Sequence, residues 1–220
     1  MSGTRVGAFI ASNIQRFIFR LVFSDHKAIF TYYYKTNKWG DGESNSGPGS
    51  SLLATENIRH ELPILIQELD IKTIFDAPCG DFNWLKEVEL PSYVKYTGGE
   101  LVDEIVDINR DLFENSQRSF MKFDIIENEI PLTDLWLCRD SLFHLSNSDV
   151  LKVLSNLRSR KIKYFLSTTF PSLDINEDIL TGEYRPINLE KIPFNLPSPL
   201  RYIDDSNNEI IGKKLGLWEL

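Results

Sequence analysis

The sequence predicts a doubly wound α/β fold built around a mostly parallel sheet, and three observations lead to this class. First, residues 73–82 form a short apolar run that ends in Asp76 and passes into a turn containing proline and glycine. Second, two further short β-prone runs end in acids, Glu100 and Asp124, at equal steps of 24 residues. Third, residues 102–113 place apolar side chains at helical spacing between those two runs. Strands that alternate with helices in this way predict a parallel sheet.

The stretch 73–82 is typical of the opening of a nucleotide-binding unit, in which a strand leads through a tight turn into a helix. A short apolar run bounded by turn residues suits a strand that is buried on both faces. We expect a helix over residues 82–88 after the turn, whose backbone N–H groups can approach a ligand closely. The three-glycine fingerprint of dinucleotide-binding turns is absent here.

The three acids at the strand ends are candidates for ligand contacts. In an open parallel sheet the carboxyl ends of the strands lie side by side, and ligands bind there. An acid about 20 residues beyond the first turn holds the ribose hydroxyls in dinucleotide folds, and Glu100 stands near that spacing. A plainer interpretation is that each acid only caps the helix that follows it. That interpretation explains one acid more readily than three at equal spacing.

The remaining chain completes the sheet. A core-facing helix is predicted over residues 52–69, with Pro63 as a kink or a restart. After the third acid we expect, in order, a fourth strand within 132–140, a helix that begins after Ser146 or Ser148, a fifth strand over 163–170, an irregular proline-rich segment over 174–200, and an antiparallel closing pair over 200–204 and 214–220.

The composition is that of an ordinary soluble globular chain. Its 220 residues are 42% hydrophobic and 25% charged, which suits one domain with a sizeable core. The net charge of −8 argues against a general nucleic-acid-binding surface. Cys79 and Cys138 make no disulfide framework, and together with the three scattered histidines they show no zinc-ligand spacing. No apolar run reaches the length of a transmembrane helix, so a cytoplasmic protein is expected, and nothing in the spacing demands a metal.

Residues 1–51 are expected to form an N-terminal extension, with a Gly/Ser-rich lid loop at its end, to the main domain over 52–220. Residues 1–24 carry a charge of +3, whereas the rest of the chain carries −11. Three interpretations of an amphipathic helix in this stretch stay open: packing on the domain or on a second copy of the chain, binding to the inner membrane surface, and an Arg-rich targeting peptide. A membrane or homodimer contact is expected through residues 5–23. The side chains on its apolar face are Ile10, Ile14, Phe17, Ile18, Leu21 and Val22.

Two irregular segments are candidate acceptor-binding loops. Residues 39–51 are rich in Gly, Ser and Pro, which is also typical of a flexible linker. Residues 174–200 are long enough to be functional in a compact domain, or to be a surface excursion that covers the sheet edge. The candidate substrate-binding side chains, which suit a polar, uncharged or anionic substrate, are Trp39, Tyr184, Arg185 and Asn188.

A histidine and an acid follow the fourth predicted strand. His144 lies just past the strand end, in the cleft expected for the three acids, and its ordinary pKa near 6.5 makes it a candidate general base. Asp140 is the second candidate, either as a base or as the group that orients His144. Arg139 could hold a carboxylate by a forked contact. A structural hydrogen-bonding role is the alternative for a lone histidine.

These motifs resemble those of class I S-adenosylmethionine-dependent methyltransferases. Residues 76–81 (DAPCGD) resemble the first motif of that family, in which a hydrophobic strand runs into D-x-x-C-G, and residues 138–145 (CRDSLFHL) resemble the fourth-strand motif of its small-molecule members. The resemblance covers roughly residues 37–220. It departs at Asp81-Phe82, which replace the usual last glycine of the first motif, and at position 100, where Asp is commoner than Glu. More narrowly, four segments together are similar to a bacterial-type subfamily associated with surface-polysaccharide synthesis: WGDGESNSGPGSS, DAPCGDFNWL, CRDSLFHLS and TGEYRPINLEKIPFNLP.

The resemblance implies a seven-stranded Rossmann-like sheet and S-adenosylmethionine as the cofactor. On the family pattern, Glu100 would hold the ribose hydroxyls and Asp124 would contact the adenine amino group. The implied reaction is in-line transfer of a methyl group to an acceptor oxygen, with His144 as the base and a sugar or glycan precursor of capsule or lipopolysaccharide type as the acceptor. The residues carried over as cofactor-binding are Asp76, Ala77, Pro78, Gly80, Glu100, Leu101, Asp124, Ile125 and Arg139.

Two other functions stay open. A nucleotide-sugar or NAD-dependent enzyme could use a similar sheet, although the glycine triplet and a Tyr-x-x-x-Lys pair are missing. A non-catalytic binding subunit could keep the fold as a scaffold and use its N-terminal helix as the partner surface.

Overall fold

The computed structural model describes residues 23, 25–40, 42–160, 162–206 and 210–220. The apolar helical face predicted within residues 1–24 lies outside the described residues. Among the helices of the part that is described, none is long and apolar enough to cross a membrane.

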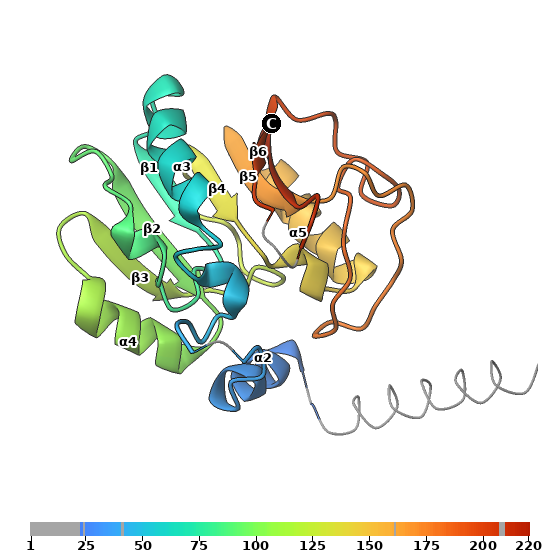
Figure 1. Ribbon diagram of the computed structural model, residues 1–220, viewed down its shortest axis with the longest axis horizontal. Coiled ribbons are helices and arrows are strands. Elements are labelled where there is room, and N and C mark those ends of the chain that lie inside the picture. Colours follow the sequence, from blue (N-terminus) through green and yellow to red (C-terminus); the bar gives the residue numbers. More distant parts are fainter. Residues whose placement is uncertain (1–22, 24, 41, 161, 207–209) are drawn as a thin grey trace, which may run out of the picture.

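A seven-stranded sheet forms the centre of the molecule, in the order β3-β2-β1-β4-β5-β7-β6 (Figure 1). The first five strands pair in parallel, and β7 runs antiparallel to both of its neighbours. This order confirms the predicted doubly wound, mostly parallel fold and its antiparallel closing pair. The strands are β1 Thr73–Asp76, β2 Lys95–Glu100, β3 Arg118–Lys122, β4 Leu135–Cys138, β5 Tyr164–Thr169, β6 Arg201–Asp204 and β7 Lys214–Glu219.

The strand order reverses between β1 and β4. Because β1 pairs with β2 on one side and with β4 on the other, the register places Asp76 beside Gly98 and Leu137. In open α/β sheets the connections diverge at such a point and leave a crevice outside the carboxyl ends of the strands, where ligands bind. The fold therefore puts the first motif at the position where a site is expected.

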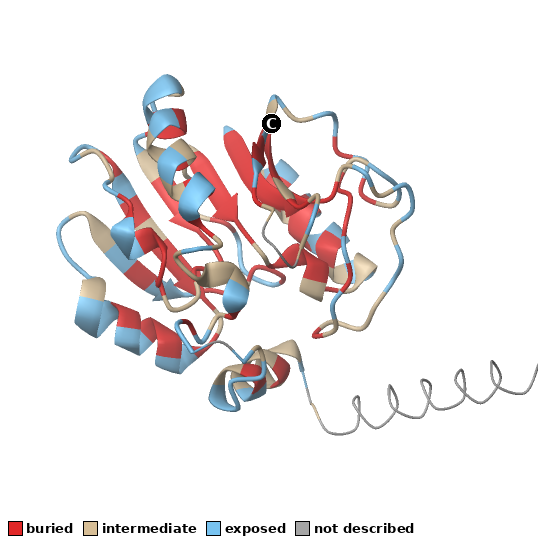
Figure 2. Cartoon of the chain, viewed as in Figure 1, coloured by how far each residue is buried: buried red, intermediate tan, exposed pale blue. Residues whose placement is uncertain are grey.

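Helices cover both faces of the sheet, and the central strands are almost wholly buried between them, whereas the edge strands β3 and β6 are largely exposed (Figure 2). Side chains of α3 pack with Ile74 and Leu135 on one face, while those of α5 pack with Phe75 and Trp136 on the other. Burying each such side chain stabilises the fold by about 1.5–3 kcal/mol. The helices are α2 His26–Lys35, α3 Glu56–Glu68, α4 Asp103–Phe113 and α5 Asn147–Ser159.

Helix α3 continues through Pro63, where the sequence predicted a kink or a restart, so there is no restart. A proline inside a helix removes one backbone hydrogen bond and crowds the preceding turn. Here Ile58, Leu62 and Leu65 are all at most 1% exposed, so the helix is held on the sheet by its buried face. Packing of that face outweighs the local penalty of the proline.

The prediction of a helix over residues 82–88 is wrong. The segment contains only a single 3-10 turn, Leu85–Glu87. Phe82 adopts a left-handed backbone conformation with φ of 58°, which an α-helix cannot accommodate. Its buried ring packs against Phe120 and Tyr96, with ring centroids 5.1 and 5.2 Å apart. The aromatic cluster thus fixes the chain in a conformation that ends any helix at this point.

The connection from β5 to β6 is irregular, as predicted, but it is not a mere surface excursion. Its side chains Ile187, Leu189, Phe194 and Leu196 are buried in the same cluster as α5. This connection therefore covers part of a sheet face. Residues 182–184 of this connection line the site described next.

Candidate active site

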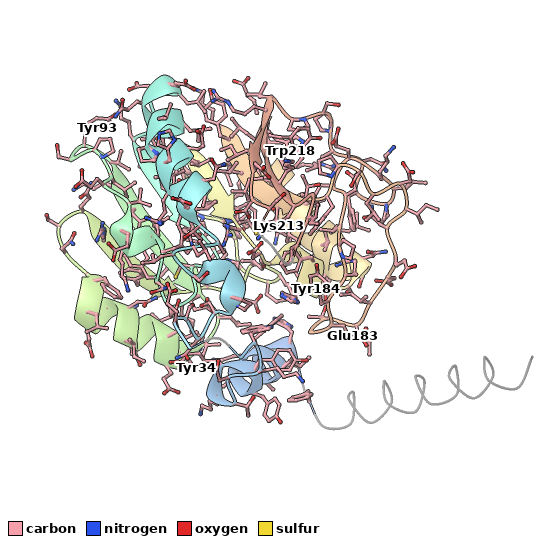
Figure 3. All side chains as sticks on the ribbon, viewed as in Figure 1. Tyr34, Tyr93, Glu183, Tyr184, Lys213 and Trp218 are labelled. Atoms are coloured by element: carbon pink, nitrogen blue, oxygen red, sulfur yellow. The ribbon has the colours of Figure 1, made fainter. Side chains whose placement is uncertain are left out.

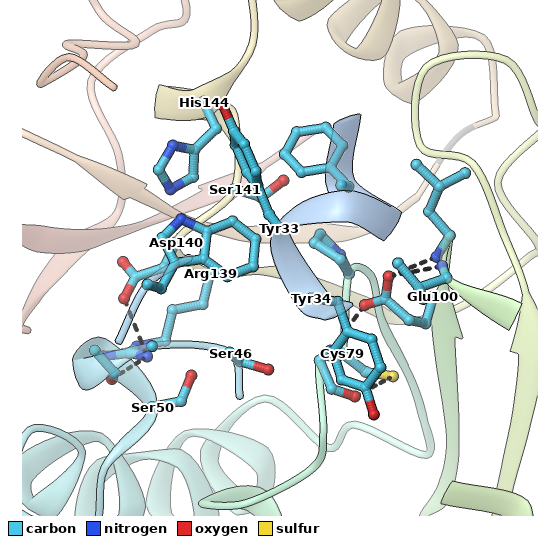
Figure 4. A pocket seen from close by; sticks show the side chains of 18 of the residues that line it. Tyr33, Tyr34, Ser46, Ser50, Cys79, Glu100, Arg139, Asp140, Ser141 and His144 are labelled. Atoms are coloured by element: carbon cyan, nitrogen blue, oxygen red, sulfur yellow. Dashed lines mark hydrogen bonds and ion pairs between the residues drawn. The ribbon is translucent and has the colours of Figure 1, made fainter. Parts of the chain in front are cut away.

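A cavity of about 560 Å³ opens at the carboxyl ends of β1, β2 and β4. Its walls come from α2, from the loop at 45–50, from the strand ends and from the tip at 182–184. Figure 4 shows Glu100 on one side of the cavity and Asp140 with His144 on the other. The residues predicted from sequence that line it are Trp39, Asp76, Pro78, Gly80, Glu100, Leu101, Asp124, Ile125, Arg139, Asp140, His144 and Tyr184.

Glu100 closes the turn after β1. Its buried carboxylate accepts hydrogen bonds from the backbone N–H groups of Gly80 (3.1 Å), Leu101 (2.7 Å) and Val102 (3.2 Å). Burial raises its pKa, although the three N–H donors oppose that effect. A carboxylate has about four lone-pair sites and these three N–H groups use three of them, so Oε2 can still accept one hydrogen bond from a hydroxyl presented from the cavity.

Asp76 lies deeper in the same wall. It is 4% exposed, and the Tyr96 hydroxyl donates to it at 2.8 Å. Burial raises the pKa of Asp76 to about 7. A cation placed in the cavity would favour the charged form of this carboxyl and would itself be stabilised.

Asp124 is held by a residue that sequence reasoning missed. Its Oδ1 accepts from the Ile126 N–H at 2.9 Å, and its Oδ2 lies 2.6 Å from Nε2 of His26 on α2. Lys27, the next residue, pairs with Asp103 at 2.6 Å. These two contacts fasten α2 to the turn after β3 and to the start of α4. A lone histidine after a helix cap gives no sequence signal for such a contact.

Docking of α2 should depend on pH through the His26–Asp124 pair. The hydrogen bond to Asp124 raises the pKa of His26 above 6.5. Protonated His26 therefore stabilises the docking of α2 fully below pH 6.5, and this stabilisation is lost as the pH rises through the raised pKa. Burial of Asp124 opposes its ionisation, but the hydrogen bonds from His26 and from Ile126 outweigh burial and lower its pKa below 3.8. The pair therefore persists on the acid side until the pH falls through that lowered pKa.

Hydrogen exchange of the α2 amides, corrected for the intrinsic rate, should show more frequent opening as the pH rises from about 5 to about 8. The variant His26→Asn should lose this dependence. Amides of α5 serve as the internal reference. An unchanged pH dependence in the variant would contradict a role for His26 in docking.

The Gly/Ser-rich loop before α3 is fixed to the first motif rather than being a flexible linker. Asp81 accepts hydrogen bonds from the Ser44 hydroxyl (2.9 Å), the Asn45 N–H (2.8 Å) and the Ser46 hydroxyl (3.2 Å). Its own N–H donates to the Ser46 oxygen at 3.0 Å. Asp81 stands at the departure from the family motif, and these contacts give that departure a physical reason.

Two glycines mark how closely this loop approaches the motifs. A Cβ on Gly80, whose φ is 57°, would lie 2.3 Å from the Ser46 oxygen. A Cβ on Gly49 would lie 2.6 Å from Oδ2 of Asp140. The carbonyl of Gly49 also accepts from Nη1 of Arg139 at 2.8 Å. The loop thus spans the cavity from the first motif, at residues 76–81, to the motif that follows β4, at residues 138–145.

Replacing Asp81 by alanine should weaken binding of S-adenosylhomocysteine (SAH) on the order of tenfold, because the loop loses three hydrogen bonds to one charged group. Calorimetric titration measures the change, and Asp81→Asn should keep much of the affinity. The matched control is Asp111→Ala, an exposed aspartate on α4. Equal affinities for the Asp81 and Asp111 variants would show that the loop does not support the cofactor end.

The floor of the cavity beside β4 is a buried network of charges. Arg139 forms a forked contact with Asp205, in which Nε and Nη2 donate at 3.0 and 2.9 Å. The Asp140 carboxylate forms ion pairs with Nζ of Lys213 at 2.9 Å and with Nη1 of Arg139 at 3.2 Å, and it accepts a hydrogen bond from the Thr168 hydroxyl at 3.2 Å. Burial opposes ionisation of Asp140, but Arg139 and Lys213 outweigh it and lower its pKa.

Asp140 therefore has other partners than the one that sequence analysis considered for it. A carboxylate held by two cations is a weak base. Asp140 also does not bind Nδ1 of His144, which is hydrogen-bonded to the Glu183 carbonyl. Asp205 and Lys213, 66 and 73 residues away from their partners, were missed because only the folded β6–β7 hairpin brings them here. Figure 3 places Lys213 in this region, apart from Tyr184 and Glu183 on the loop after β5.

His144 stands at the edge of the cavity in a defined protonation state. Its Nδ1–H donates to the backbone carbonyl of Glu183 at 2.9 Å, so Nε2 is the nitrogen that carries the lone pair. Burial lowers the pKa of His144 below 6.5, which keeps the imidazole neutral near pH 7. Its neighbours are the rings of Phe143, Tyr184 and Trp39, at centroid distances of 4.6, 5.8 and 5.9 Å. Such a group can accept a proton from a hydroxyl in the cavity.

Three predicted site residues are not in the lining. Arg185 is buried and donates to the carbonyls of Leu142 and Glu177. Asn188 is buried and donates to the carbonyl of Leu173. Both hold the irregular loop together, so their positions give no support to a substrate contact. Ala77 lies behind the lining, and its N–H donates to Leu137 of β4.

Comparison with known proteins identifies the fold. No family model and no curated protein matches the chain. Among solved structures, the methyltransferase domain of a bacterial Hen1 matches with a TM-score of 0.57 and 12% identity, over 76% of this chain and 100% of that one. Magnesium protoporphyrin IX methyltransferase from Synechocystis PCC 6803 with bound SAH matches with a TM-score of 0.58 and 15% identity, over 88% and 98%.

Human N-acetylserotonin methyltransferase with bound S-adenosylmethionine matches with a TM-score of 0.57 and 11% identity. The match covers 91% of this chain and 58% of the human enzyme. Likeness at such low identity establishes the fold alone. The chain has the class I S-adenosylmethionine-dependent methyltransferase fold.

Proposed function

We propose that this protein is an S-adenosylmethionine-dependent O-methyltransferase that acts on a sugar or glycan precursor, with His144 as the general base. One observation carries the proposal. Three strand-end acids and a neutral histidine with a free ring nitrogen line the same cavity, on its two sides.

The residues around the β1 turn fit the cofactor. Glu100 offers a carboxylate oxygen to a ribose, and Asp124 offers an acceptor to an adenine amino group beside His26. Asp76, whose pKa is about 7, suits a cationic ligand nearby. When bound, S-adenosylmethionine supplies an electrophilic methyl group on a sulfonium and leaves as the neutral thioether SAH.

His144 has the properties that removal of a hydroxyl proton requires. The neutral ring can take the proton on Nε2, and the hydrogen bond from Nδ1–H to the Glu183 carbonyl strengthens as the ring becomes positive. The rings of Trp39 and Tyr184 flank it and offer flat faces against which a sugar ring can lie. The loops that carry these two residues border the cavity from different parts of the chain.

Transfer of labelled methyl groups from S-adenosylmethionine to a panel of sugars and nucleotide-sugars tests the proposal. We expect transfer that depends on His144 and yields one SAH for each methyl group. Reduction or oxidation of NAD with the same panel would favour the dehydrogenase alternative. Binding of SAH without transfer to any acceptor, unaffected by His144→Ala, would favour a non-catalytic subunit.

A further inference from the structure

The two buried cations of the cavity floor are already neutralised by protein groups. Nζ of Lys213, which is 0% exposed, lies 2.9 Å from Asp140 and 3.1 Å from Asp205. Arg139 forms a bidentate contact with Asp205 and also an ion pair with Asp140. Two cations and two carboxylates give this network no net charge. Its donors are directed at protein oxygens rather than at the cavity.

No other buried cation among the described residues faces the acceptor side. His144 is neutral near pH 7 because burial lowers its pKa. Arg185 donates to the carbonyls of Leu142 and Glu177 and to the side chain of Asn147, none of which lines the cavity. His26 is bound to Asp124 at the cofactor end. Lys38 lines the mouth but is exposed, where water screens its charge.

The acceptor side is walled by rings. Tyr33 and Trp39 lie 5.6 Å apart between centroids, and Phe143 lies 5.2 Å from Tyr184, with His144 in contact with three of the four. The carboxylate oxygens of Asp140, whose charge Lys213 and Arg139 balance, lie next to this wall. An anion that entered would lose its water, find no cation to pair with, and face a carboxylate.

We propose that the acceptor is a neutral hydroxylated ring, and that the site rejects acceptors whose entering ring bears a carboxylate or a phosphate. This inference rests on the proposed function and narrows its substrate class. The sequence suggested a polar substrate, either uncharged or anionic, and this inference keeps only the uncharged alternative. Discrimination comes from the floor network, in which Asp205 and Asp140 balance the two cations.

Matched pairs of acceptors test the charge rule on the full chain. The pairs are methyl glucoside with methyl glucuronide, and catechol with 3,4-dihydroxybenzoate. The measurements are the rate of SAH release and binding to the SAH-loaded protein by saturation-transfer NMR. We expect kcat/KM or binding to favour the neutral member on the order of tenfold or more. Equal or better use of the anionic member, or binding of neither neutral ring, overturns the inference.

A variant that changes the charge of the cavity floor tests whether the buried network causes the preference for neutral rings. Asp205→Asn adds one net positive charge to the floor, and Asp205 is not in the lining, so we expect the preference for neutral rings to fall several-fold. Asp204→Asn makes the same change one residue earlier, on an exposed side chain paired with Lys214, and should leave the preference unchanged. Equal preferences in the two variants count against the network as its origin. If Asp205→Asn does not fold, the matched pairs on the wild type decide.

Different results would overturn the proposed function and the neutral-acceptor inference. Absence of SAH binding removes the proposed function itself. SAH binding together with His144-dependent transfer to a hydroxyl of an anionic ring leaves the proposed function standing and removes only the neutral-acceptor inference. Transfer to an amine without any need for His144 would overturn both.

Discussion

Replacing His144 by alanine should lower kcat by about 10²- to 10⁴-fold while leaving the affinity for SAH nearly unchanged. The reason is geometric: Nδ1–H is bound to the Glu183 carbonyl, and Nε2 is the ring nitrogen left to take the acceptor proton. Because burial lowers the pKa of His144 below 6.5, kcat should rise with pH through that lowered pKa and level off above it. The variant should lack this acid limb. Steady-state kinetics across pH measures both effects.

A second histidine provides the control. His60 lies on α3 with its side chain 74% exposed and outside the cavity, so His60→Ala should keep wild-type kinetics. Full turnover by His144→Ala, or loss of turnover together with loss of SAH binding, would place the base elsewhere or make His144 a structural residue.

Replacing Glu100 by alanine should reduce affinity for SAH by about 100-fold or more, since hydrogen bonds to a charged group contribute about 1.5–3 kcal/mol each. The same change removes the acceptor of the Gly80, Leu101 and Val102 N–H groups. Each buried donor left unpaired destabilises the fold by about 1–3 kcal/mol. Calorimetry measures the first effect, and urea unfolding the second.

The variant Glu100→Gln separates the two effects. Its amide oxygen can still accept backbone N–H groups, so stability should largely return, while the ribose contact loses its charge. Glu89→Ala, at an exposed position outside the cavity, is the matched control. Wild-type SAH affinity in both Glu100 variants would mean that the cofactor assignment is wrong.

Local patterns were enough to predict the sheet. The runs that end at Asp76, Glu100 and Asp124 are short and β-prone, and they coincide with β1, with β2, and with the end of β3 and the turn after it. The helix predicted over residues 82–88 does not form because Phe82 packs against Tyr96 and Phe120. Helical spacing within the segment cannot show such contacts with later parts of the chain. Tertiary packing decided that conformation.

The candidate site was only partly predictable, for a related reason. Strand-end acids and His144 are placed by elements that sequence patterns locate. The contacts of His26, Asp205 and Lys213 join segments 66 to 98 residues apart, and no local pattern carries them. Arg185 illustrates the converse, since a residue type common in binding loops here ties its loop to the segment after β4 and to α5 and does not line the cavity.

The measurement that bears most directly on the cofactor assignment is a calorimetric titration of the purified protein with SAH, with NAD as the control ligand. We expect SAH to bind with a Kd in the micromolar range and NAD not to bind. Binding of NAD alone, or of neither ligand, would contradict the assignment of this cavity to S-adenosylmethionine.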